Sequence, residues 1–157
     1  MVRTDLPDPQ LEFAFEVRAE IEPARRVGGG GPGEVLWFVP ITGGTVSGPR
    51  FSGTVVPGGG DWYVDRDGVS EVDARYLLQH DDGTLVDIRN RGFFFAEPEV
   101  VERMDAGEHV DEREFYFRMT PRFRTDSAEH GWMSRTVFVG LGRQEGPTIC
   151  IRFFAVG

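Results

Sequence analysis

The chain contains no lysine, because all 17 basic residues among its 157 are arginine. Schiff-base chemistry requires a side-chain amine, so the sequence excludes this class of enzyme. The 26 acidic residues outnumber the basic ones and give a formal net charge of -9. Nucleic acid and anionic membranes both bind through basic surfaces, so we expect neither as a partner.

Cysteine, histidine and long apolar runs are also scarce. The single cysteine, Cys150, excludes an internal disulfide, and its apolar neighbours predict a buried thiol. No run approaches the about 18 apolar residues of a membrane-spanning helix, and residues 1–10 lack the apolar core of a secretory leader. We therefore expect a cytoplasmic protein. His80, His109 and His130 show no metal-ligand spacing, so we expect no metal and no cofactor.

Short β-type runs make up most of the sequence. Residues 11–21 alternate between apolar and polar side chains, which is typical of a half-buried strand. Similar runs follow at residues 35–41, 53–56, 62–65, 69–80, 84–92, 114–120, 132–142 and 148–156. Asp67-Gly68 and Asp82-Gly83 lie between such runs and predict hairpin turns. A proline and a glycine bound the one helical pattern, which predicts a short helix near residues 98–106.

These elements predict an all-β protein with a flexible lead-in at residues 1–10 and a single domain over residues 11–157. Many strands need protected edges, which either a closed barrel or a sandwich provides. The polar faces of residues 71–78 and 114–120 mix charge with aromatic or apolar side chains, which suits either solvent or a lined cavity. We favour a closed antiparallel barrel of about eight to ten strands, which can hold one small ligand.

The segment Pro57-Gly58-Gly59-Gly60 is incompatible with a helix or a central strand, because proline lacks the backbone N–H and glycine resists ordering. We expect a tight turn here that presents Asp61 and Trp62. The segment lacks the Gly-Lys-Ser/Thr ending of a phosphate loop. Asp61 is therefore interpreted either as a carboxylate desolvated by Trp62, which would act as a base, or as a cap of the turn.

Two further pairs of side chains could act chemically. Asp73 and Arg75 share a strand face, and form either a lumen pair that holds an enolate or carboxylate or a solvent-facing ion pair. Tyr116 and Arg118 form either an oxyanion-stabilising pair or an arginine packed over an aromatic ring on the outer wall.

Other polar and aromatic residues complete the predicted site. Asn90 could orient a carbonyl group or support a turn, and His130 lies beside Trp132. We predict catalytic roles for Asp61, Asp73, Tyr116, Arg118 and His130. We predict substrate contacts for Trp62, Arg75, Tyr76, Asn90, Trp132 and Ser134.

Four separated segments carry a resemblance to a known family: GGTVSGPRFSGTVVPGGGDW, DGVSEVDARYLLQHDDGTLVDIRNRG, EFYFRMTPRF and VFVGLGR. The sequence resembles the domain of unknown function 3237 family of calycin-like closed β-barrels, over nearly its whole length. The resemblance implies a ligand-sized cavity and no single activity; the likeness to allene-oxide-cyclase-like barrels concerns the fold alone. This chain has His130 and Ser134 where the family pattern has tyrosine and asparagine, and Phe93-Phe94-Phe95-Ala96 where it has polar residues and glycine.

Two functions fit these observations. The first is a cofactor-free cyclase, isomerase or lyase of specialised metabolism that acts on an apolar, polyketide-like or aromatic small molecule in the lumen. The alternative is a barrel that carries a hydrophobic small molecule without changing it. An enzyme predicts a buried acid of perturbed pKa in the cavity, whereas a carrier predicts an apolar lumen. Exposed aromatic residues at 93–95 or in the last strand are a basis for a homodimer.

Overall fold

The computed structural model describes residues 1–157 and consists mainly of nine strands. The strands are β1 (Leu11–Ile21), β2 (Arg25–Gly28), β3 (Glu34–Ser47), β4 (Gly53–Arg66), β5 (Val69–His80), β6 (Leu85–Ala96), β7 (Phe115–Arg124), β8 (Phe138–Glu145) and β9 (Thr148–Val156). The helices are α1 (Pro98–Asp105) and the 3-10 turns η1 (Glu112–Glu114) and η2 (Gly131–Arg135). None of them has the length and apolar character needed to cross a membrane.

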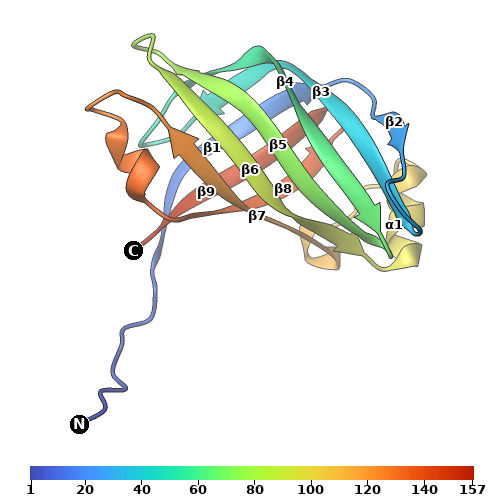
Figure 1. Cartoon of the computed structure of the whole chain (residues 1–157), viewed down its shortest axis with the longest axis horizontal. Coiled ribbons are helices and arrows are strands. Elements are labelled where there is room, and N and C mark those ends of the chain that lie inside the picture. The colour runs from blue at the N-terminus through green and yellow to red at the C-terminus, as the bar shows by residue number, and fades with distance from the viewer.

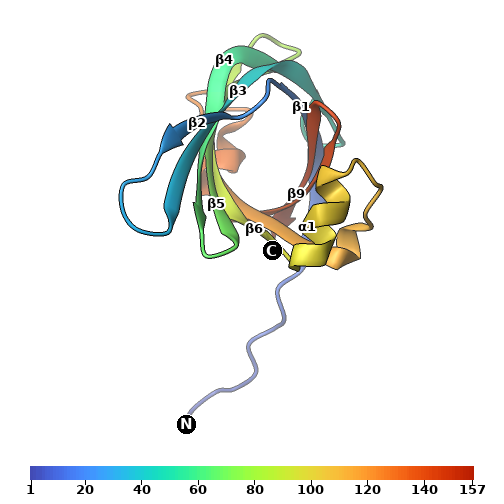
Figure 2. The ribbon, with the colours of Figure 1, turned by 90° about the vertical axis from the view of Figure 1, so that its right-hand side faces the viewer.

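The strands form a closed antiparallel barrel (Figures 1 and 2). From β3 to β9, each strand pairs with the next one along the chain, and β1 closes the ring by pairing with both β3 and β9. β2 is an extra strand that pairs only with β3. The predicted all-β closed barrel and the helix near residues 98–106 are thus confirmed. Residues 1–10 precede the first strand and extend away from the barrel in Figure 1.

Both predicted Asp-Gly hairpins are present. Asp67 and Gly68 join β4 to β5 with φ angles of 52° and 82°. Positive φ at both central residues is the geometry that a two-residue hairpin favours, because its twist matches that of the strands. Asp82-Gly83 joins β5 to β6, with φ of 92° at Gly83.

The prediction of a turn at residues 57–60 is wrong, because these residues lie inside the continuous strand β4. The register against β5 shifts between Val56 and Gly60, where a β-bulge bends the strand. Gly58 has a φ of 116°, and a Cβ on Gly60 would lie 2.2 Å from the ring of Phe38. Proline and glycine are therefore tolerated in this strand because they bend it at a bulge.

The predicted strand at residues 132–142 begins only at Phe138. The preceding residues 131–135 form η2, whose Met133 is buried. A 3-10 turn places its side chains by a period of three, so the apolar residues of this segment reach the core without strand pairing.

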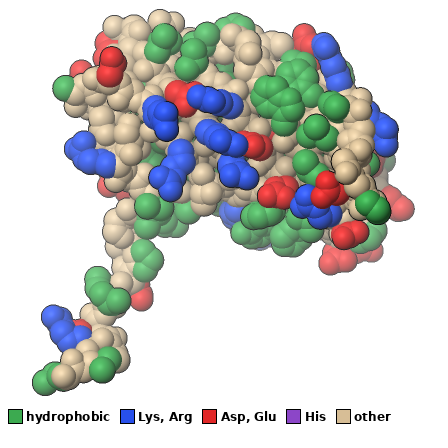
Figure 3. Space-filling model, in the orientation of Figure 1, with side chains coloured by type: hydrophobic (Ala, Val, Ile, Leu, Met, Phe, Trp, Pro, Cys, Tyr) green, Lys and Arg blue, Asp and Glu red, His purple; other side chains and the backbone are tan.

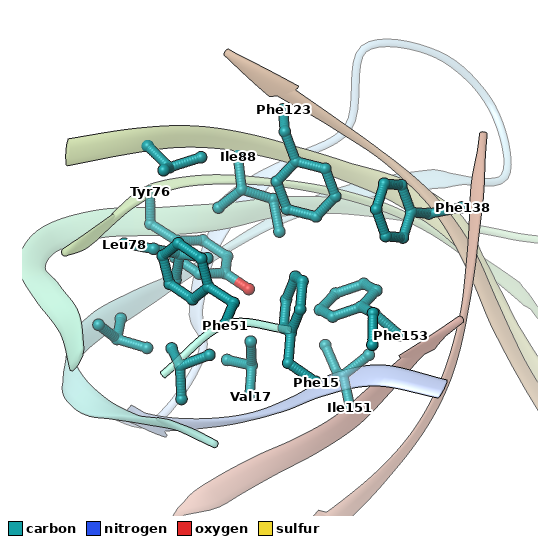
Figure 4. Close-up of a cluster of buried hydrophobic side chains, with 14 of the residues drawn as sticks. Phe15, Val17, Phe51, Tyr76, Leu78, Ile88, Phe123, Phe138, Ile151 and Phe153 are labelled. Carbon is teal, nitrogen blue, oxygen red and sulfur yellow. The ribbon is translucent and has the colours of Figure 1, made fainter. Parts of the chain in front are cut away.

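A cluster of phenylalanine rings fills the end of the barrel that η2 covers (Figure 4). Phe15 lies at its centre, with ring centroids 5.4–6.3 Å from those of Phe51, Phe123, Phe138 and Phe153. Fully burying one such side chain stabilises the fold by about 1.5–3 kcal/mol. The aromatic core therefore closes one half of the barrel, and the cavity lies in the half nearer α1.

Candidate active site

The lumen of the barrel contains a cavity of about 1300 Å³ at the α1 end. Inward-facing side chains of β1 and of β3–β9 form its wall, and residues of α1 and of the following segment 107–112 line its mouth. Figure 2 looks into the barrel from this end. Of the 34 lining residues 18 are hydrophobic, so the cavity suits a mainly apolar ligand while retaining polar groups that could orient it.

Asp61 is the most perturbed acid of this wall. It faces the lumen from β4, directly after the bulge, and its Oδ1 accepts the backbone N–H of Asp73 at 2.9 Å. Burial raises the pKa of Asp61 from 3.8 to about 6; the hydrogen bond from Asp73 opposes this effect, and the negative charge of Asp73 adds to it. The lumen-facing alternative for Asp61 is therefore correct, and a group with this pKa can exchange a proton near neutral pH.

Asn90 and Asp61 lie on the same face of the barrel wall, two strands apart, with the small side chain of Ala74 between them. Asp61 pairs with Ala74 on β5, and Ala74 pairs with Asn90 on β6. Two interstrand spacings of about 4.8 Å place the Asp61 and Asn90 backbones about 10 Å apart. Asn90 is only 2% exposed, and its Oδ1 has no hydrogen-bond partner in the protein. Of the two interpretations of Asn90, the structure therefore agrees with the one that places it in the lumen.

Two tyrosines lie beside Asp61 in the lumen wall. Tyr76 is buried, and its hydroxyl also lacks a protein partner. Burial, followed by the charge of Asp61, raises the pKa of Tyr76, so this hydroxyl keeps its proton. Burial and the charges of Asp65 and Asp61 similarly raise the pKa of Tyr63 to about 12. Both phenols are therefore hydrogen-bond donors beside an ionisable carboxylate.

Charge in and around the lumen is strongly negative. The lining carboxylates are those of Glu22, Asp61, Asp65, Asp105, Glu108, Glu112 and Glu145. Arg143 is the single lining arginine, and it donates hydrogen bonds to both Glu112 and Glu145. Because like charges repel in a cleft with low-dielectric walls, this mouth disfavours anionic ligands.

The prediction that Asp73 and Arg75 face the lumen is wrong. Their strand alternates, so that Val72, Ala74 and Tyr76 line the cavity while Asp73 and Arg75 lie on the outer wall. There Arg89 donates two hydrogen bonds to Asp73, and Arg75 donates one to Asp87. These groups belong to an arginine-rich outer surface over β5–β7, visible in Figure 3.

Tyr116, Arg118 and Trp62 also lie outside the lumen, contrary to the prediction. Tyr116 is 42% exposed and stacks on Phe95, and the Arg118 guanidinium lies 5.4 Å from the Tyr116 ring centroid. Trp62 is 47% exposed and packs on Phe38. Trp62 therefore does not desolvate Asp61, because neighbouring residues of one strand point to opposite faces.

His130, Trp132 and Ser134 lie at the other end of the barrel. His130 is buried beside Phe51 and His80, Trp132 packs on Phe138, and Ser134 is exposed. His130 and Trp132 line a separate cavity of about 320 Å³. The prediction that these three residues share a site with Asp61 is wrong.

Sequence reasoning missed Tyr63, Asp65 and Ser70, which line the lumen near Asp61. The signal was present: residues 61, 63 and 65 alternate along one strand, so they share a face. Their orientation follows once Asp61 is known to point inward.

These features define a class of protein, a small closed β-barrel with a ligand-sized and partly polar lumen. The chain belongs to the family described as protein of unknown function (DUF3237), which it matches over residues 9–156. The resemblance seen in the sequence is thereby confirmed.

Similar proteins share the fold over the whole chain. A UPF0311 protein of Rhodopseudomonas palustris is 32% identical over 146 residues, which cover 92% of this chain and 95% of that protein. The crystal structure of a β-barrel-like protein from Acinetobacter baumannii superposes with a TM-score of 0.85 at 29% identity, covering 99% of this chain and 100% of that chain.

A more distant relative carries the name of an enzyme. The hydroalkoxylation enzyme phnH of Penicillium herquei is 35% identical over 78 residues, which cover 50% of this chain and 52% of that protein. The crystal structure of an enzyme from Penicillium herquei superposes with a TM-score of 0.74 at 22% identity, covering 99% of this chain and 100% of that chain. At 22% identity, this structural likeness shows a shared fold alone.

Proposed function

We propose that the protein is an enzyme that needs no cofactor and that cyclises or isomerises an uncharged, largely apolar small molecule in the barrel lumen. The observation that carries the proposal is Asp61, an ionisable carboxyl group in the wall of an apolar cavity with a pKa raised to about 6. Perturbed acids in cavities of this kind are typical of proton-transfer sites.

Asp61 supplies the proton chemistry of the proposal. At pH 7 a carboxyl group of this pKa is mainly ionised, and it binds a proton about a hundredfold more strongly than an ordinary aspartate. It can therefore accept a proton from a substrate hydroxyl group and return it later in the reaction. The N–H of Asp73 holds one carboxylate oxygen and leaves the other to face the substrate.

Tyr76 and Asn90 are proposed to bind and polarise the substrate. A substrate carbonyl oxygen that accepts a hydrogen bond from the Tyr76 hydroxyl would draw electrons from a conjugated double bond, while Asn90 Oδ1 would accept a hydrogen bond from a substrate hydroxyl group. Both residues are buried and have polar atoms without protein partners, so a ligand in the lumen would satisfy them.

The name of the Penicillium enzyme suggests the reaction class, the addition of an O–H group across a carbon–carbon double bond. Asp61 takes the hydroxyl proton, the oxygen forms a bond to one alkene carbon, and the other carbon receives a proton. The product is an isomer of the substrate, so the reaction consumes no oxidant, reductant or second substrate. The cavity contributes by holding the chain of the substrate in a reactive conformation.

The carrier function is the second candidate, and the mainly apolar lining of the lumen favours it. A carrier would bind the same molecules without using the ionisation of Asp61. The two functions therefore differ in what replacing Asp61 does: an enzyme loses turnover, whereas a carrier loses at most part of its affinity.

The test uses 2′-hydroxychalcone, an uncharged enone with a neighbouring phenol that closes to a flavanone by this addition. We expect the protein to accelerate closure and to give one enantiomer in excess. Asp61→Asn should abolish the excess, whereas the matched outer-wall variant Asp87→Asn should retain it. Binding of the chalcone with only racemic background closure would support the carrier function instead. Enantioselective closure by Asp61→Asn would contradict the role of Asp61.

A further inference from the structure

A second cluster of chemically active side chains lies at the end of the barrel opposite Asp61. It consists of His80 at the end of β5, Asp82 in the turn before β6, and His130 before η2. His130 Nε2 lies 3.0 Å from Asp82 Oδ2, and His80 Nδ1 lies 3.2 Å from Asp82 Oδ1. One potential ligand atom from each residue lies within 4.8 Å of the other two.

We propose that His80, Asp82 and His130 bind a divalent transition-metal ion. Two imidazole nitrogens and one carboxylate oxygen are the donor set of open zinc sites and of non-haem iron sites. Metal–ligand bonds of about 2.1 Å place neighbouring ligand atoms about 3.0–3.4 Å apart, from octahedral to tetrahedral geometry, close to the distances between Asp82 and each histidine. Small side-chain rotations suffice to bring the three ligands around one ion.

The surrounding structure holds the ligands in place. Asp82 Oδ1 accepts the backbone N–H of Thr84 at 2.8 Å, which fixes the carboxylate within its turn. The backbone N–H of His130 donates a hydrogen bond to Ser127 Oγ at 3.3 Å, and the imidazole ring of His130 packs edge-on against Phe51. His80 Nδ1 accepts the backbone N–H of Asp82 at 3.0 Å, which fixes the orientation of the His80 ring. The ion would replace that N–H as the partner of His80.

The cluster has an open side. Both histidines line the cavity of about 320 Å³, together with polar residues that include Ser52 and Glu129. Three protein ligands beside such a cavity leave coordination positions for water or a small oxygen-containing ligand, as in catalytic rather than structural sites. The phenylalanine cluster separates this cavity from the lumen, so the metal site is independent of the chemistry proposed at Asp61.

The spacing of the histidines in the sequence predicted no metal site. Spacing along the chain could not reveal this site, because His80 and His130 are fifty positions apart and only the fold places their rings 4.3 Å apart, centroid to centroid.

Titration of the full chain with Co²⁺ tests the proposal, because nitrogen and oxygen ligands give bound Co²⁺ characteristic visible absorption bands. We expect one equivalent to bind with such bands and Zn²⁺ to displace it. His130→Tyr and His80→Gln should each weaken binding by at least about tenfold, since even residues that only orient ligands have effects of that size. His109→Gln changes the third histidine, which is exposed and lies outside the cluster. This variant is the matched control and should bind Co²⁺ with the affinity of the original chain.

Three results would overturn the proposal. The first is the absence of saturable Co²⁺ bands in the folded original chain. The second is equal Co²⁺ affinity of the original chain, His130→Tyr and His80→Gln, with each variant shown to be folded by its circular dichroism spectrum. Loss of binding by His109→Gln alone would likewise assign the ion to a different surface site.

Discussion

Replacing Asp61 by asparagine should stabilise the folded protein at pH 8 and change its stability little at pH 4. Asparagine keeps an oxygen that can accept the N–H of Asp73, but it never carries the buried negative charge. In the original chain, burial raises the pKa of Asp61 above its unfolded value, so ionisation favours the unfolded state. Stability is therefore lost as the pH rises from about 4 to about 6.

The size of the effect follows from the pKa. The pKa rises from 3.8 to about 6 on folding. Each pKa unit corresponds to about 1.4 kcal/mol, so the charged carboxylate destabilises the fold by up to about 3 kcal/mol at pH 8. At pH 4 the same linkage gives only about 0.5 kcal/mol. The gain from Asp61→Asn should therefore grow by about 2–3 kcal/mol between these pH values.

Urea denaturation at several pH values between 4 and 8 measures this difference as a free energy of unfolding. Asp87→Asn, on the outer wall beside Arg75, is the matched control and should show no such growing gain. A gain that is equal at pH 4 and pH 8 would refute the assignment of a desolvated Asp61. A loss of stability at pH 8 would show that the charged carboxylate is itself a favourable part of the fold.

Three further predictions follow from the lumen and its wall. Measured by quenching of the intrinsic fluorescence, 2-naphthol should bind with at least about tenfold higher affinity than 2-naphthoate, a difference of about 1.4 kcal/mol. Added salt should reduce this preference. Equal affinities would contradict the negative charge at the mouth of the cavity. Tyr76→Phe should change the free energy of unfolding by less than about 0.5 kcal/mol in urea, since its hydroxyl has no protein partner; a loss above about 2 kcal/mol would contradict this. Gly92→Ala should destabilise by about 2–3 kcal/mol, because its Cβ would lie 2.1 Å from the carbonyl oxygen of Arg118. Gly31→Ala, with open space around the position, is the control for thermal or urea unfolding, and equal effects of the two substitutions would contradict the close contact.

The fold class is readable in the sequence because local rules determine it. Alternating side chains define half-buried strands, and Asp-Gly pairs define the hairpins that connect them. The antiparallel order then follows, since successive strands joined by short turns pair with each other. The segment at residues 57–60 was predicted incorrectly for a physical reason: a bulge lets proline and glycine remain inside a strand, and a bulge depends on the partner strands.

The site was only partly predictable. Asp61, Tyr76 and Asn90 lie in the lumen as predicted, whereas Asp73, Arg75, Tyr116 and Arg118 lie on the outer wall. Strand alternation identifies which residues share a face, but it does not say which face turns inward when both carry polar and aromatic side chains. That choice depends on burial against the other strands of the closed barrel.

By itself, the sequence determined an all-β chain, its hairpins, its short helix and its family, because strand periodicity and turn chemistry are local. The tertiary structure alone decided which face of each strand encloses the lumen, that Asp61 and Asn90 lie on either side of Ala74 in its wall, and that His80 and His130 meet at the far end. These arrangements arise from closure of the barrel, which brings together residues of distant strands and removes the Asp61 carboxylate from water.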